Sequence, residues 1–165
     1  MKTAPILVFT LFAALVLQAC ASSSKPQPSE DSAQMERTIE QMFAAFSRGD
    51  LDGFLYALAD DFVYEKDGRE PLHGKAAFRE FASEGVLASS DAEVKPLRMV
   101  VMGNQAVAEI RYEGTHDKGT FYGLAPTGRN LTFGWAFWAT FENGKIVRLK
   151  SFSDPDVLKE QLGID

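Results

Sequence analysis

The stretch that decides the fold runs from Asn130 to Ser153 and reads NLTFGWAFWATFENGKIVRLKSFS. Its side chains follow a period of two, which is the period of a β-strand. The dipeptide Asn143-Gly144 interrupts the alternation, and an Asn-Gly pair between two such segments is a strong hairpin signal. We therefore predict an antiparallel hairpin made of strands 130–142 and 145–153.

The same period of two begins upstream at Val94 and predicts further strands at 94–102, 105–115 and 119–124. The earlier part of the chain instead repeats its apolar residues every three or four positions, which predicts helices at 35–46 and 51–58, with a third at 75–83. Gly49 ends the first of these helices and Asp50 caps the second. A short strand at 61–64 and a final helix at 156–162 complete the pattern. The order predicts an α+β fold, with helices packed over the concave face of a curved antiparallel sheet.

The N-terminal segment is typical of a secretion signal. Lys2 precedes an apolar run from Ala4 to Leu17, which is shorter than the roughly 20 apolar residues of a membrane-spanning helix. Leu17-Gln18-Ala19-Cys20 resembles a bacterial lipobox, and Cys20 is the only cysteine of the chain. We expect a lipoprotein signal peptide at 1–19, a lipid-anchored flexible tether at 20–32 that begins at Cys20, and one globular domain at 33–165. The alternative is an ordinary signal peptide with an incidental cysteine.

Ala21 follows the cysteine, where an aspartate would favour retention in the inner membrane. The predicted location is therefore the outer membrane of a bacterial envelope, with the domain facing the periplasm.

Composition excludes several classes of function. The chain has 165 residues, a net charge of −6 and two histidines, so it lacks the basic surface of a nucleic-acid-binding protein. One cysteine and two histidines are too few for a typical zinc site. We expect no cofactor, no metal and no nucleic-acid partner.

Several residue strings resemble the nuclear-transport-factor-two-like superfamily, and its SnoaL-like polyketide cyclase branch in particular. They are Ser47–Asp52, Ala59–Tyr64, His73-Gly74-Lys75, Gly114-Thr115-His116, Gly123, Pro126-Thr127-Gly128 and Phe141–Val147. The resemblance covers about residues 33–164. It implies a cone-shaped α+β barrel with a pocket between the concave sheet face and the helices, and dimers across the sheet.

The acidic positions that catalyse proton transfer in such families are largely absent here. The base of the steroid isomerases falls on Lys66, their tyrosine near Met42 and their second acid near Phe137. Relatives often carry an acid at the end of the last strand and a second acid three residues on; here these positions are Ser151 and Asp154, so only the second acid is kept. Whether the domain is an enzyme is therefore left open by the sequence.

His116 is the remaining candidate for acid–base chemistry. It shares a strand face with Tyr112, so a pair of His116 with Tyr112 or Tyr64 could transfer protons near neutral pH. The alternative is that His116 is a hydrogen-bonded residue at a strand end that fixes the loop to Pro126. His73, in a turn before a helix, is interpreted as structural.

Tyr64, Phe133, Trp135 and Phe137 are the predicted ligand-binding residues. Phe133, Trp135 and Phe137 match the parity of the pocket face in relatives, although packing in the core is the competing interpretation. The leading hypothesis is a lipoprotein domain that binds a small apolar molecule. The alternatives are a small-molecule isomerase, cyclase or dehydratase that uses His116, and a non-catalytic module that interacts with another envelope protein.

Overall fold

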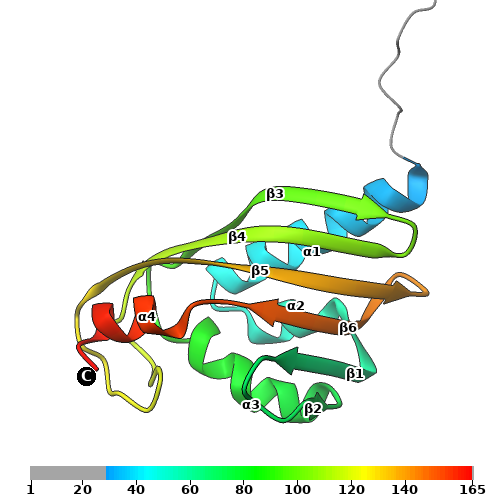
Figure 1. The fold of residues 1–165 in the computed structure, drawn as a ribbon. Helices are drawn as coiled ribbons and strands as arrows, with labels where there is room; N and C mark the ends of the chain where they lie inside the picture. The colour runs from blue at the N-terminus through cyan, green and yellow to red at the C-terminus, as the bar shows by residue number, and fades with distance from the viewer. Residues whose placement is uncertain (1–28, 165) are drawn as a thin grey trace, which may run out of the picture.

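The computed structural model describes residues 29–164, and the predicted signal peptide, Cys20 and most of the tether lie outside them. One six-stranded sheet organises the domain, with the strand order β2-β1-β6-β5-β4-β3 (Figure 1). The elements, in chain order, are α1 (Glu30–Ser47), α2 (Leu51–Tyr56), β1 (Leu58–Lys66), β2 (Leu72–His73), α3 (Lys75–Val86), β3 (Glu93–Met102), β4 (Gln105–Thr115), β5 (Asn130–Glu142), β6 (Lys145–Phe152) and α4 (Pro155–Leu162). The predicted α+β class with a curved sheet is confirmed.

The β5–β6 hairpin forms around the predicted turn. Glu142 pairs with Lys145, and the two turn residues Asn143 and Gly144 have φ angles of 50° and 75°. Both positive values suit the two-residue hairpin turns that match the twist of a sheet. The strands β3, β4, β5 and β6 extend this antiparallel order, so the four predicted strands are confirmed.

Strand β1 joins the sheet differently, because it runs parallel to β6. This pairing places Tyr64 beside Leu149, and Lys66 beside Ser151. A parallel pair needs a long connection between its two strands. Here the connection from β1 to β6 contains most of the other elements of the domain. The first and the last strands in chain order therefore lie side by side within the sheet.

The helices cover one face of the sheet through aromatic side chains. Phe43 of α1 lies 5.8 Å from Phe137 of β5, measured between ring centroids. Phe78 of α3 lies 5.0 Å from Phe62 and 4.8 Å from Tyr64, both on β1. These contacts place the core between α1, α3 and the inner face of the sheet.

Several local predictions differ from the structure. The first helix begins at Glu30, so residues 30–32 are helical and do not belong to the predicted flexible tether. The predicted helix to Leu58 ends at Tyr56, because Leu58 already pairs with Ile146 as the start of β1. The edge strand β2 was not predicted; it is only Leu72–His73.

Residues 119–124 do not form the predicted strand. A bridge from Phe121 to Leu124 closes a tight turn, in which Tyr122 has a φ of 52°. The Gly119 N–H donates to the Leu87 carbonyl at 2.9 Å, so this segment is bound to the end of α3 instead of to the sheet.

Candidate functional site

A cavity of about 630 Å³ lies between the inner face of the sheet and the helices α1, α2 and α3. This volume is within the range of roughly 300–1,000 Å³ that is typical of small-molecule sites. Most of its lining is apolar and aromatic, including Phe43, Phe54, Phe78 and Phe81 from the helices. The cavity can therefore enclose an apolar body of small-molecule size.

The four predicted ligand-binding residues all line this cavity: Tyr64, Phe133, Trp135 and Phe137. Phe137 is fully buried, whereas Phe133 and Trp135 are half-buried and their ring centroids are 5.8 Å apart. Of the two competing interpretations, core packing therefore fits Phe137 and ligand binding fits Phe133 and Trp135. Phe137 packs in the core, and Phe133 and Trp135 present partly open faces.

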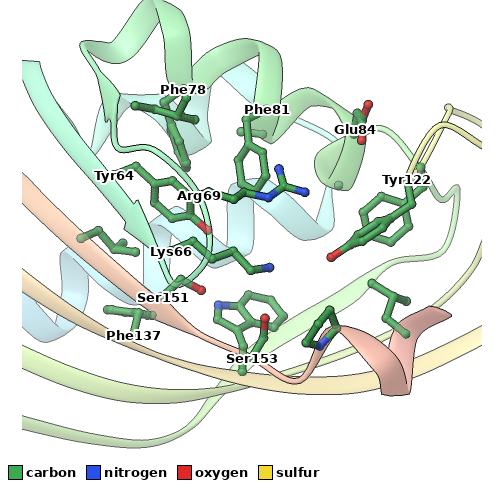
Figure 2. A pocket seen from close by; sticks show the side chains of 18 of the residues that line it. Tyr64, Lys66, Arg69, Phe78, Phe81, Glu84, Tyr122, Phe137, Ser151 and Ser153 are labelled. Carbon is green, nitrogen blue, oxygen red and sulfur yellow. The ribbon is translucent and has the colours of Figure 1, made fainter. Parts of the chain in front are cut away.

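One wall of the cavity is polar. Tyr64 and Lys66 are two positions apart on β1 and point to the same side, and Ser151 of β6 lies beside them (Figure 2). Burial raises the pKa of the Tyr64 phenol, and a hydrogen bond with Ser151 opposes that rise. Burial also lowers the pKa of Lys66, as does the positive charge of Arg69 to a smaller extent. This wall therefore presents hydroxyl groups and a half-buried ammonium to the cavity.

Arg69 extends the positive charge toward the mouth of the cavity. Its guanidinium lies 5.7 Å from the ring centroid of Phe81, over the ring face (Figure 2). Three exposed carboxylates also line the mouth: Glu70, Glu80 and Glu84. None of the ion pairs within residues 29–164 joins one of these carboxylates to Lys66 or Arg69.

His116 lies outside the cavity lining. Its side chain is fully buried, with Nε2 2.9 Å from the Gly119 carbonyl oxygen and Nδ1 3.1 Å from the Thr127 hydroxyl. A carbonyl only accepts hydrogen bonds, so Nε2 carries a proton and donates it. Both ring nitrogens are thus engaged in holding the loop from 117 to 128, as the structural interpretation of this residue requires.

Tyr112 also lies outside the lining. Its hydroxyl is hydrogen-bonded to Ser89, and its ring stacks on Phe133 at 4.7 Å between centroids. Burial raises the pKa of the Tyr112 phenol, while the hydrogen bond with Ser89 acts in the opposite direction. The structure therefore does not bring His116 and Tyr112, the two predicted catalytic residues, to the cavity surface.

Asp154 lies at the cavity but has a structural partner. Its carboxylate accepts a hydrogen bond from the Asp156 N–H at 2.9 Å and caps α4. No group of three or more His, Cys, Asp or Glu side chains within residues 29–164 is arranged to hold a metal ion. In the same range, no helix is long and apolar enough to cross a membrane.

Sequence reasoning did not assign Lys66, Arg69 and Ser151 to the site. One usable signal was present, since Lys66 follows Tyr64 by two positions on a strand and so shares its face. Arg69 had no such signal, because it lies in the loop after β1, where the alternation ends.

Comparison with known proteins identifies the fold. A family model described as "SnoaL-like domain" matches residues 39–149. A protein from Jannaschia sp. CCS1, assigned as a SnoaL-like polyketide cyclase, is 17% identical with a TM-score of 0.74, over 86% of this chain and 99% of that chain. TsrD from Streptomyces laurentii is 23% identical with a TM-score of 0.68, over 79% of this chain and 96% of that one. An LEH-like epoxide hydrolase from M. tuberculosis is 20% identical with a TM-score of 0.60, over 79% and 93%. A search among curated proteins found no match.

Proposed function

Because the chain belongs to the SnoaL-like domain family, we propose that its domain binds a small, largely apolar molecule in the cavity between the sheet and the helices. The observation that carries this proposal is the cavity itself, with a volume of about 630 Å³ and an aromatic lining. A non-catalytic interaction module with a closed interior would have no such space. Fold alone does not choose among the functions of this family, so the cavity residues must.

A direct test uses the neutral fluorescent probe N-phenyl-1-naphthylamine, titrated into the purified protein. The probe is expected to bind at one site per domain. Ala77 lines the cavity and its neighbour Ala76 on α3 does not, although both are exposed. Ala77→Trp should weaken binding and Ala76→Trp should not. A folded wild-type domain that fails to bind the probe would contradict the proposal.

Acid–base catalysis by His116 is the alternative function. It requires the imidazole to reach a substrate, and His116 is neither a lining residue nor free at either nitrogen. We therefore favour the loop-fixing role for His116. Structural similarity to an epoxide hydrolase does not alter this preference, since that similarity concerns the fold.

We further propose that the domain is attached to a bacterial envelope through a lipid on Cys20 and faces the periplasm from the outer membrane. The supporting feature is the sequence Leu17–Cys20 behind a charged and then apolar N-terminus. The expected result for Cys20→Ala is loss of the lipid mass and release from membranes. A Cys20→Ala protein that still carries lipid would contradict this part of the proposal.

The same proposal includes a homodimer across the outer face of the sheet. Three side chains form an exposed apolar row over three neighbouring strands: Val100 (67% exposed), Val107 (42%) and Trp138 (47%). Such a row supports an interface, because a partner would remove it from water. Light scattering at micromolar concentration should give the mass of two chains, and Val107→Glu should give the mass of one.

A further inference from the structure

We propose that the molecule bound in the cavity carries one anionic group on its apolar body, and that Lys66 and Arg69 hold that group. This inference rests on the proposed function, since it names the chemical class of the molecule that fills the cavity. The anionic group can be a carboxylate, a sulfate or a phosphate ester, because all three accept hydrogen bonds from an ammonium and a guanidinium.

The first support is that neither cation has a carboxylate partner among residues 29–164. The ion pairs within residues 29–164 include neither Lys66 nor Arg69, although both line the same cavity. Lys66 is half-buried, and its neighbour Arg69 is positively charged as well. Burying a charge is unfavourable unless it is paired, so an anion from outside the protein would stabilise this arrangement.

The second support is that nearby carboxylates are held on the other face of the sheet. Glu65 and Asp67 flank Lys66 in the sequence, but Glu65 pairs with Arg148 and Asp67 pairs with Lys150 at 3.1 Å. Alternation along β1 directs Glu65 away from the side where Lys66 lies, and Asp67, just after the strand, is occupied by its pair with Lys150. The inner face of β1 therefore keeps its positive charge while the outer face is neutralised.

The third support is the set of hydrogen-bond donors around Lys66. Figure 2 shows the Lys66 amine and the Tyr122 hydroxyl directed into the same part of the cavity, with the Tyr64 and Ser151 hydroxyls nearby. Hydroxyl groups beside a cation add donors to an anion without adding charge. A single head group could thus contact several donors at once.

The carboxylates at the mouth limit the charge of the ligand. Four lining carboxylates, those of Glu70, Glu80, Glu84 and Asp154, are exposed and solvated, so their repulsion of one entering anion is screened. Repulsion grows with the charge of the ligand, which favours a monoanion over a polyanion. The apolar lining then accepts the rest of the molecule.

The test compares two probes with the same ring system. Anilinonaphthalene-8-sulfonate carries a sulfonate, and N-phenyl-1-naphthylamine lacks it. The anionic probe is expected to bind the wild-type protein more tightly than the neutral one. Lys66→Met and Arg69→Met should each lower the affinity for the anionic probe by about tenfold, the typical effect of one charge-assisted hydrogen bond. In both variants the ratio of the anionic to the neutral affinity should fall, because the neutral probe carries no group that either cation can hold.

The matched control is Lys118→Met, which removes one exposed positive charge away from the cavity. It should change neither affinity. Circular dichroism and the melting temperature verify that each variant is folded. If the neutral probe fails to bind the folded wild-type protein, the proposed function fails. If the neutral probe binds but the anionic probe gains nothing from Lys66 and Arg69, the anion inference is overturned and the proposed function stands.

Displacement of the neutral probe distinguishes the sources of the anion. Dodecanoate, dodecyl phosphate and dodecanol share one chain and differ in the head group. Stronger displacement by dodecanoate would assign a carboxylate, and stronger displacement by dodecyl phosphate a phosphate ester. Equal displacement by dodecanol would overturn the inference.

Discussion

Two polar clusters of this domain differ in whether their groups are partnered. The closed cluster joins β4 to its neighbouring loops and consists of Ser89, Tyr112, His116 and Thr127. The open cluster consists of Tyr64, Lys66, Arg69 and Ser151 on the wall and mouth of the cavity. In the closed cluster each side chain has a partner within the protein, whereas the two cations of the open cluster form no ion pair within residues 29–164.

The difference teaches that residue type alone is a poor guide to function. A buried histidine beside a tyrosine has the chemistry of an acid–base pair, yet here both side chains are fully engaged in holding loops. A lysine in place of an expected acid suggests a lost activity, yet its surroundings suit an anion. Charged side chains that form no ion pair within the described part of the protein indicate the functional site.

The largest expected effect on stability is that of His116→Ala. This change removes a fully buried side chain together with its hydrogen bonds to the Gly119 carbonyl and the Thr127 hydroxyl, so we expect a loss of about 3 kcal/mol in the free energy of unfolding. The melting temperature should fall by roughly 10 °C. Binding of the neutral probe, measured well below the transition, should be retained. Unchanged stability with lost binding or turnover would instead assign His116 to the functional site.

A smaller effect is expected when one phenol hydroxyl is removed from each cluster. Tyr112→Phe leaves the buried Ser89 hydroxyl unpaired and should cost about 1–2 kcal/mol. Tyr64→Phe should cost about half as much or less, because its hydroxyl borders a cavity that admits water. Urea denaturation of both variants measures the difference. Equal losses in the free energy of unfolding would show that the two phenol hydroxyls contribute equally to stability, which would contradict this prediction.

Acid should weaken the closed cluster through the two carboxylates beside it. Asp91 accepts hydrogen bonds from the Thr115 N–H at 2.7 Å and hydroxyl at 2.8 Å, and these bonds lower its pKa. Hydrogen bonds from the Ser90 hydroxyl and N–H likewise lower the pKa of Asp117. A lowered folded-state pKa contributes stability above the ordinary aspartate value of about 3.9, and this contribution is lost as the pH falls through the lowered values.

The melting temperature measured from pH 6 to pH 2 should therefore fall less steeply for Asp91→Asn than for the wild type. Asp61→Asn, on an exposed position of β1, serves as the control for the loss of one negative charge. If the melting temperature of Asp91→Asn falls with acid as steeply as that of the wild type, the Asp91 carboxylate does not stabilise the closed cluster.

The smallest expected effect concerns the open cluster at alkaline pH. Because the pKa of Lys66 is lowered, its charge is lost at a lower pH than the value of about 10.4 for an ordinary lysine. Arg69 stays charged, and the raised pKa of Tyr64 keeps that phenol neutral. Affinity for the anionic probe should fall a few-fold as the pH rises through the lowered pKa of Lys66. Lys66→Arg should remove this fall. A pH-independent affinity in the wild-type protein would exclude Lys66 as the titrating group.

The alternation of residues predicted most of the sheet because it depends only on neighbours along each strand. Phe133, Trp135 and Phe137 could be assigned to the inner face on parity alone, and the Asn143-Gly144 turn set their register. The segment 119–124 was predicted wrongly because the backbone partner of Gly119 is Leu87, which comes from the end of a helix. No local pattern encodes such a contact.

The site was harder to predict for the same reason. His116 shares a buried face with Tyr112 as its parity indicates, but its partners Gly119 and Thr127 lie in a loop whose path is set by tertiary contacts. The role of Lys66 depends on where Glu65 and Asp67 find their partners, and these are residues of β6. Charge pairing across the sheet, and not the sequence around Lys66, leaves this cation without a counterion.

The parallel pairing of β1 with β6 has a consequence for how the domain folds. Glu65 and Arg148, which join these strands, are 83 positions apart in the chain. Closing such a long loop has a large entropic cost, and proteins dominated by distant pairings fold slowly. During synthesis, β1 must wait for the C-terminal strand before it can dock. The wall that holds Tyr64, Lys66 and Ser151 is therefore completed last, and a chain truncated before Lys145 would lose it.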